Sequence, residues 1–350
     1  MVPDPHPRWA EESAVLKFVI RRVLQMGLAL IMLSLLLFAW LRALPGGPVS
    51  ALLGERGSPE AAADLRRQLG LDQPLPVQYV RFVQRALDGD FGISTGVFRG
   101  QPALDIFLTR LPATIELSIF ALAIALTLAI PLGYISARRR GGVLDTGLVI
   151  SSLVGVAVPV FFLAFVLKYL FAVRWGLLPP SGYQTAGIDA TRVTGFAVLD
   201  GILTREWDAS WDAFRHLLLP AIALSSIPFA VIFRITRASV LDVMDEDYVR
   251  TARAKGLRAP VIRVRHIMRN ALIPVITIIG LQVGALLAGA VLTEKVFAFP
   301  GIGQALALGF ETRDYPVLQV LIMMAAIIYI VVNLLVDIAY ALIDPRVRTK

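Results

Sequence analysis

The side chains best able to form a specific interaction lie in one segment, residues 250–270, with the sequence RTARAKGLRAPVIRVRHIMRN. The segment contains seven Lys or Arg and no Asp or Glu. A basic cluster of this density can bind nucleic-acid phosphates, anionic lipid headgroups or an acidic protein surface, and it can also fix the side of a membrane on which a loop stays. The structure predicted for the residues around the segment discriminates among these roles.

Residues that could support catalytic or metal chemistry are few. The chain has no Cys, which excludes disulfides, thiolate metal sites and cysteine nucleophiles. Its three His (His6, His216 and His266) are far apart in the sequence, and neither an H-E-x-x-H pattern nor a nucleophile motif occurs. We therefore expect no catalytic residue, no metal and no cofactor bound by this chain, and a membrane-embedded enzyme is a weak interpretation.

The composition indicates a membrane protein. Of the 350 residues 57% are hydrophobic and only 17% are charged, whereas a soluble domain has about 25% charged residues. The net charge of +8 could by itself point to nucleic acid, but a soluble protein could not bury this much apolar surface. The N-terminal segment is long and partly acidic, and no small-residue cleavage site follows its apolar run, so we expect a retained cytoplasmic tail over residues 1–22.

Six runs are long and apolar enough to cross a bilayer, which takes about 20 residues with few charges. None alternates in the way a strand does, so the fold class expected is an all-α membrane protein. Pro220 and Pro228 make the fourth run the weakest, because proline bends a helix and leaves a carbonyl unpaired. The runs are residues 23–41, 117–137, 146–167, 216–233, 270–293 and 315–336.

The charges predict the orientation. With the N-terminus inside, the inner segments hold 19 Lys or Arg against 10 Asp or Glu, and the outer segments hold 15 against 16. The positive-inside rule therefore predicts that both termini are cytoplasmic, including a short tail at residues 346–350. Residues 117–345 then form the core of the protein.

The first outer loop, residues 42–116, is long enough to form an extracytoplasmic platform. Ser58 and Pro59 predict a helix start, Gly70 predicts its end, and residues 77–87 predict a second helix that ends at Gly89. A surface decoration without a partner is the alternative. The second long outer loop, residues 174–215, has mixed charge and no firm pattern.

The basic segment belongs to a cytoplasmic loop, residues 236–269, with a predictable shape. The helical pattern of the fourth span continues to Lys255, with Leu241, Met244, Tyr248 and Ala252 on one face, and Gly256 ends it. Pro260 is placed to start a short amphipathic helix with an apolar stripe of Val261, Val264 and Met268. We expect a turn between this short helix and the fifth span.

This shape disfavours a nucleic-acid site, because no aromatic residue lies between Thr251 and Ile273 to stack on a base and both ends of the loop are fixed at the membrane. Headgroup contact and a purely topological role stay open. The glycine break and the apolar stripe favour a knob that fits a groove on a partner protein.

The segment DYVRTARAKGLRAPVIRVRHIMRNALIPV resembles the cytoplasmic loop of ABC-importer membrane subunits, in the variant of the dipeptide/oligopeptide permease B branch. RALPGGP, LGLDQPLPVQYVRF, RLPATIELS, GLLPPSGY and VFAFPGIGQ add to the resemblance, which covers roughly residues 15–345. The general importer motif places Glu-Ala-Ala where this chain has Arg250, Thr251 and Ala252, so a role of that glutamate does not transfer.

The resemblance implies a type I importer permease in the bacterial inner membrane that binds no ATP itself. It implies four kinds of partner besides membrane lipid: a second homologous permease subunit, one or two P-loop ATPases that bind ATP and Mg²⁺, an extracytoplasmic substrate-binding protein and a peptide substrate. A coupling helix at about residues 257–265 would dock on the ATPase. The residues expected to take part in docking are Ala254, Lys255, Gly256, Leu257, Arg258, Pro260, Val261, Arg263, Val264 and Arg265.

Several alternatives remain at this level. Cargo in this branch includes nickel complexes, glutathione-like compounds and oligosaccharides as well as peptides. An ion-coupled secondary transporter is disfavoured, because the chain shows no internal repeat and no acid in the middle of a span. The charges that flank the spans are expected to be structural anchors, with Glu116 the best candidate for a pathway residue; the others are Lys168, Glu294, Lys295 and Asp337.

Overall fold

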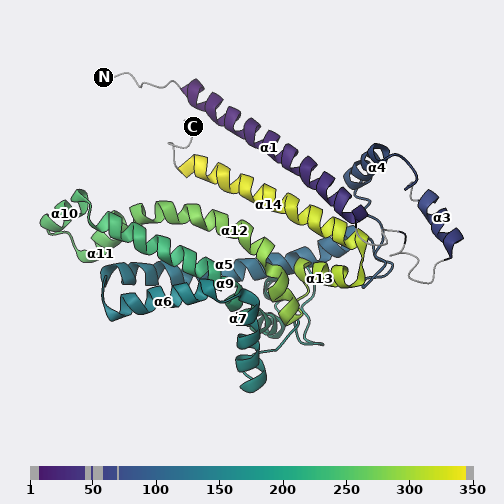
Figure 1. Ribbon diagram of the computed structural model, residues 1–350. Coiled ribbons are helices and arrows are strands. Elements are labelled where there is room, and N and C mark those ends of the chain that lie inside the picture. Colours follow the sequence, from purple (N-terminus) through teal and green to yellow (C-terminus); the bar gives the residue numbers. More distant parts are fainter. Residues whose placement is uncertain (1–7, 44–48, 50–57, 69–70, 344–350) are drawn as a thin grey trace. The chain divides into compact units, whose positions relative to one another are not determined.

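The computed structural model describes residues 8–43, 49, 58–68 and 71–343. Within these residues every regular element is a helix, apart from one isolated bridge between Ile93 and Pro102 (Figure 1). Five helices are long and apolar enough to cross a membrane, and one bent helix pair makes a sixth candidate. The predicted all-α class is therefore confirmed for the described residues. Five of the six predicted runs each lie within one helix, and the third, residues 146–167, falls on the bent pair.

The chain divides into two compact units, and the first consists of residues 1–111 and 305–350. Its described helices are α1 (Arg8–Ala43), α3 (Pro59–Gln68), α4 (Leu75–Leu87), α14 (Tyr315–Ile343), the first turns of α5 (Ala103–Arg138) and most of α13 (Ile302–Thr312). Pro59 begins α3 as predicted, whereas Gly70 lies outside the described residues. Helix α1 packs against α14 and α4.

A buried carboxylate orders the loops of this first unit. Asp314 is 1% exposed and accepts hydrogen bonds from Ser94 Oγ and from the backbone N–H groups of Thr95 and Gly96. Asp314 thus holds the end of the long first loop against the turn that precedes α14.

The second unit, residues 112–304, holds the remainder of α5 and a group of helices around α9. Its elements after α5 are α6 (Val143–Ala157), α7 (Val160–Leu167), the π-helix η1 (Lys168–Arg174), α8 (Ala197–Leu203), α9 (Trp207–Met244), α10 (Asp247–Ala254), α11 (Ala259–Val261), the π-helix η2 (Ile262–Met268) and α12 (Arg269–Phe297).

Helix α9 is the central helix of this unit. In its most apolar stretch 72% of the residues are buried, against 17% in α1. Helices α6, α7, α8 and α12 all pack on it. This explains why the fourth run tolerates Pro220 and Pro228: neighbouring helices shield the carbonyls that proline leaves unpaired.

The third predicted span is not straight. The helix axis bends by 104° between α6 and α7–η1. The break falls at Val158, which is extended (φ −78°, ψ 122°) because the following Pro159 disfavours helical geometry in the residue before it. The third predicted run, residues 146–167, therefore lies in two helices with a sharp bend between them.

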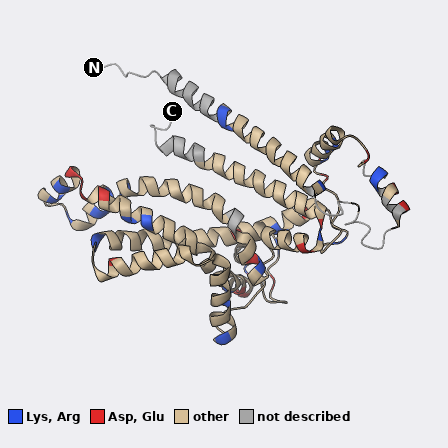
Figure 2. Ribbon diagram, in the orientation of Figure 1, with Lys and Arg blue, Asp and Glu red and all other residues tan. Residues whose placement is uncertain are grey.

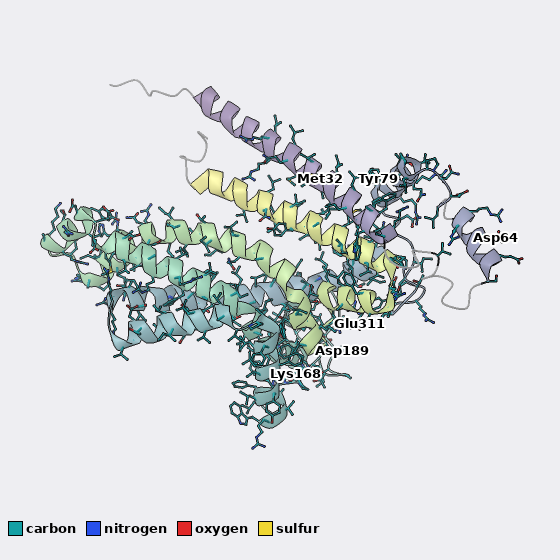
Figure 3. The ribbon with its side chains drawn as sticks, in the orientation of Figure 1. Met32, Asp64, Tyr79, Lys168, Asp189 and Glu311 are labelled. Carbon is teal, nitrogen blue, oxygen red and sulfur yellow. The ribbon has the colours of Figure 1, made fainter. Side chains whose placement is uncertain are left out.

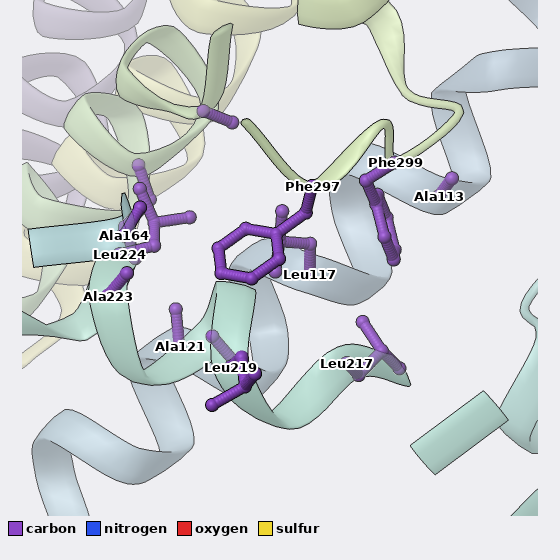
Figure 4. Packing of buried hydrophobic residues seen from close by; sticks show 13 residues of the cluster. Ala113, Leu117, Ala121, Ala164, Leu217, Leu219, Ala223, Leu224, Phe297 and Phe299 are labelled. Carbon is purple, nitrogen blue, oxygen red and sulfur yellow. The ribbon is translucent and has the colours of Figure 1, made fainter. Parts of the chain in front are cut away.

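The apolar core of the second unit draws on helices that are distant in sequence. Leu117 and Ala121 of α5, Leu217 and Leu224 of α9, and Phe297 at the end of α12 form one cluster (Figure 4). Alanines let the helix backbones approach closely, as expected for helices that pack in lipid.

We predict that Gly133→Ala destabilises the protein. A Cβ at Gly133 of α5 would lie 2.9 Å from Cβ of Thr236 and 3.1 Å from the carbonyl oxygen of Phe233, both on α9. Overpacking of this kind costs about 1–3 kcal/mol, which outweighs the gain in helix propensity. The melting temperature, followed by tryptophan fluorescence, should fall.

Gly147→Ala on α6 is the matched control, because no atom lies within 4 Å of its Cβ position. Its melting temperature should stay equal or rise. Equal effects of the two substitutions would contradict close packing of α5 on α9.

Candidate functional site

The basic loop, residues 236–269, contains two short helices on either side of a left-handed glycine. Helix α9 ends at Met244, two non-helical residues follow, and α10 spans Asp247–Ala254. Gly256 has φ +70°, and the N–H groups of Gly256 and Leu257 donate to the carbonyls of Arg253 and Ala252. This hydrogen-bond pattern is the Schellman motif, and it confirms that Gly256 ends the helix.

Two expectations about this loop were wrong. The helix does not continue from α9 to Lys255, because it breaks at Asp245 and Glu246; in consequence Val249 is buried and Tyr248 is exposed. No turn separates the short helix from the fifth span either. From Ala259 the chain runs through α11 and η2 directly into α12 with helical backbone angles.

The π-helix η2 determines which side chains of the loop are buried. Ile262 and Ile267 are 7% and 4% exposed, and their spacing of five residues matches the i→i+5 repeat of a π-helix. Val261 and Val264 are instead 41% and 62% exposed. The predicted stripe thus contains two residues that face away from the protein.

The buried side of the loop packs on the ends of the membrane helices. Val249, Ile262 and Ile267 form a cluster with Ala137 at the end of α5 and Val240 near the end of α9. The Asn270 side chain also donates to the Tyr248 hydroxyl at 2.8 Å, which joins α10 to α12. The loop therefore has a fixed back and an exposed front.

All ten residues predicted for docking lie on the exposed front. Each is exposed, and Leu257 is 42% exposed. Figure 2 shows charged residues gathered around α10 and α11 and sparse along α9 and α12. The ten are Ala254, Lys255, Gly256, Leu257, Arg258, Pro260, Val261, Arg263, Val264 and Arg265.

A buried ion pair that the sequence did not reveal lies at the base of the loop. Arg237 of α9 donates through Nε and Nη2 to the two carboxylate oxygens of Asp145 at 2.7 and 2.8 Å. Ser136 Oγ and the Gly141 N–H also donate to Asp145, which is 4% exposed. The available signal in the sequence was an Asp three residues after the basic ARRRGG stretch.

At the other end of α12, residues from three sequence motifs come together: two of the motifs donate to Glu294, and the third donates to Phe297. The Glu294 side chain is fully buried; Thr114 Oγ1, from RLPATIELS, donates to it at 2.7 Å, and the Gln304 N–H, from VFAFPGIGQ, donates at 3.0 Å. A Cβ on Gly301 would overlap the carboxylate, so only glycine fits there. The Gly182 N–H, from GLLPPSGY, donates to the Phe297 carbonyl.

Glu116 is also buried, at 3% exposed, and it orders the long loop of residues 174–215. It accepts from the Ala197 and Val198 N–H groups at the start of α8, and from the hydroxyl of Tyr183. Burial and the nearby charge of Glu116 raise the pKa of Tyr183, which stays protonated as a donor. This geometry gives Glu116 a structural function, and its predicted pathway role stays a prediction.

Three more carboxylates order the same loop, whose sequence shows no firm secondary-structure pattern. Asp200 accepts hydrogen bonds from the N–H groups of residues 193–195 and from the Thr194 hydroxyl. Burial acts to raise the pKa of Asp200, but the hydrogen bonds together outweigh it, and the pKa is lowered. Glu206 accepts from Thr191, and Asp212 from Thr185. Each carboxylate accepts hydrogen bonds from backbone N–H groups that would otherwise be paired in a helix or sheet, and so holds the loop without regular secondary structure.

The remaining flanking charges differ in their surroundings. Lys168, labelled in Figure 3, donates to the Val296 carbonyl at 2.8 Å and so neutralises the C-terminal end of α12. Lys295 is exposed, and the Asp337 side chain lies outside the described residues. Among the described residues no group of three or more His, Cys, Asp or Glu could hold a metal ion.

Comparison with protein families decides the class of the chain. Residues 129–349 match the binding-protein-dependent transport system inner membrane component, and residues 15–118 match the N-terminal part of the same kind of membrane component. The chain belongs to this permease family. It is a multi-pass protein of the bacterial inner membrane.

Relatives of this permease match it over nearly their full length. The dipeptide transport system permease protein DppB of Escherichia coli K12 is 42% identical over 340 residues, covering 96% of this chain and 100% of the relative. The di/tripeptide transport system permease protein DppB of Pseudomonas aeruginosa UCBPP-PA14 is 45% identical over 335 residues, covering 95% of this chain and 99% of the relative.

We predict that Asp145→Ala lowers the free energy of unfolding of the permease by about 3 kcal/mol, because it leaves the Arg237 guanidinium without its buried partner. The midpoint of unfolding in detergent measures the change. Asp247→Ala is the matched control, since its ion pair with Arg250 is exposed on both sides; its effect should be below about 1 kcal/mol. Similar losses in the two variants would contradict a bracing role for Asp145.

A graded pair of substitutions tests the Glu294 site. Glu294→Ala leaves the buried Thr114 hydroxyl and the Gln304 N–H without this acceptor, at about 1–3 kcal/mol for each donor. Glu294→Gln keeps the shape and one acceptor oxygen, so its loss should be smaller. Unfolding midpoints in the order wild type, Gln, Ala are expected, and an unchanged midpoint for Glu294→Ala would refute the site.

Proposed function

We propose that this permease forms half of the translocation pathway for di- and oligopeptides in an ATP-driven importer. The relatives named for dipeptide and di/tripeptide transport support this cargo. Nickel complexes, glutathione-like compounds and oligosaccharides are the alternatives within the same architecture. Identification of the ligand on the cognate substrate-binding protein separates them, and a ligand that is not a peptide would overturn the peptide assignment.

The proposed topology has six spans and two cytoplasmic termini, in the type I importer arrangement with a long first extracytoplasmic loop. The five apolar helices and the bent pair α6–η1 supply the spans. The charge asymmetry between alternate loops supports the orientation. The Trp175, Trp207 and Trp211 side chains are more than half exposed, which suits the outer membrane–water interface.

The partners follow from the family. We propose one further permease subunit, one or two P-loop ATPases that carry ATP and Mg²⁺, and an extracytoplasmic substrate-binding protein. This chain then binds no nucleotide and hydrolyses none. ATP can drive transport only if it favours one conformation of the complex over the other, so the permease must transmit the ATPase conformation to its membrane helices.

The observation that carries the docking proposal is the contrast between the two sides of the loop. Ile262 and Ile267 hold its back in the permease core, while Leu257, Val261 and Val264 project outward. Arg258, Arg263 and Arg265 are exposed around these apolar residues. A small apolar knob inside a cationic ring fits an apolar groove with an acidic rim on the ATPase.

We predict that Val264→Asp abolishes ATPase docking without unfolding the permease, because the side chain is 62% exposed. Loss of a central apolar contact costs about 2 kcal/mol or more, which is roughly a 30-fold loss in affinity. Co-purification of the ATPase with the tagged permease measures it. Val143→Asp, at a 93% exposed position after the ARRRGG turn, is the control and should retain the ATPase.

The glycine break offers an independent pair of variants. Gly256→Pro removes the N–H that donates to Arg253 and forbids φ +70°, whereas Gly256→Asn tolerates the left-handed conformation. We expect transport and ATPase association to be lost only in the proline variant. Normal co-purification with both Gly256→Pro and Val264→Asp would refute docking through this loop.

A further inference from the structure

We propose that α4 is an interfacial helix whose outer face inserts into the lipid bilayer beside α1, rather than part of a water-exposed platform. Helix α4 lies in the long loop after the first span, and both α1 and α4 belong to the first compact unit. On the orientation proposed above, the lipid concerned is the outer leaflet.

The depth of α4 follows from its contacts with α1. The apolar stretch of α1 runs from Ile20 to Trp40. At 1.5 Å per residue its length of 21 residues is about 31 Å, which matches the hydrocarbon core of a bilayer. The Ser34 hydroxyl is 2.8 Å from the Tyr79 hydroxyl of α4, roughly 9 Å along the helix axis before Trp40. Tyr79 therefore contacts a part of α1 that lies within the bilayer.

Aromatic contacts fix this placement. Phe38 of α1 packs edge-on against the rings of Tyr79 and Phe82, with ring centroids 5.3 and 5.6 Å apart. One turn later Arg42 donates to the Gln78 side chain at 2.9 Å. Helix α4 is thus attached at three successive turns near the end of the span. Figure 3 labels Tyr79 on α4 and Met32 on α1.

The apolar side of α4 is wider than its contact with α1. Tyr79 and Phe82 cover one part of this side. Val80, Val83 and Leu87 follow at helical spacing, and Val80 and Leu87 are 53% and 82% exposed. At this depth the exposed side chains adjoin the lipid-facing surface of α1, where Met32 and Leu36 are 57% and 66% exposed.

The polar edge of α4 completes an interfacial pattern. Arg81 is exposed, and Arg85 pairs with Asp90 while its own side chain stays 54% exposed. Basic residues along one edge of a helix and apolar residues along the other place a helix flat in the headgroup region. The exposed apolar side therefore fits acyl chains, and the arginines fit lipid phosphates and water.

Single-cysteine labelling tests the proposal directly, because the chain contains no Cys. We would assemble the full permease with its partner subunits in lipid nanodiscs, with one nitroxide at Val80→Cys or Leu87→Cys. Relaxation by oxygen, which concentrates in lipid, is compared with relaxation by a water-soluble nickel chelate. Leu36→Cys supplies the lipid reference and Arg81→Cys the polar reference.

We expect the oxygen-to-nickel accessibility ratio at Val80→Cys and Leu87→Cys to match that at Leu36→Cys and to exceed that at Arg81→Cys several-fold. A ratio equal to that at Arg81→Cys would place the face in water and overturn the proposal. Low accessibility to both reagents would mean that a protein partner covers the face, which also overturns it. Neither outcome depends on docking at the cytoplasmic loop or on the cargo.

Discussion

A carboxylate that has no access to water must find its hydrogen-bond donors within the protein, and this constraint governs the second compact unit. Glu294 meets it with Thr114 and with the backbone of the turn after α12. An unmatched buried charge costs several kcal/mol. The Glu294 site therefore requires three features at once: the turn after α12, Gly301 within it, and Thr114 near the start of the membrane part of α5. Asp145 applies the same constraint at the loop end of α9.

Glu294 and Asp145 both help to specify how the membrane helices pack. Apolar helices in lipid gain little from hydrophobic association with one another, so small residues and polar contacts must specify how they pack. Gly133 lets α5 approach α9 closely, and Asp145 with Arg237 then fixes the register of the α5–α6 turn against α9. The basic loop packs on these helix ends, which holds its exposed valines in a defined position.

The sequence predicted those features that depend on local composition. Apolar runs predicted the membrane helices, and Gly256 predicted the end of α10, since only the local backbone is involved. The sequence did not predict features that depend on contacts between residues far apart in the chain. The pairing of Asp145 with Arg237 joins residues 92 apart, and the hydrogen bond from Thr114 to Glu294 joins residues 180 apart. The continuous helix through η2 was missed because π-helical spacing resembles no regular apolar repeat.

The π-helix also limits how the length of the loop can vary. A π-turn holds one more residue than an α-turn, and this extra residue allows Ile262 and Ile267 to face the core while Val264 faces outward. Deleting any one residue from Ile262–Met268 would restore α-helical geometry and rotate the preceding segment by about 100° relative to α12. The valines would then turn away from their present direction. A gain or loss of a single residue in this segment therefore changes the direction of every side chain before it in the loop, whereas a substitution changes one side chain only.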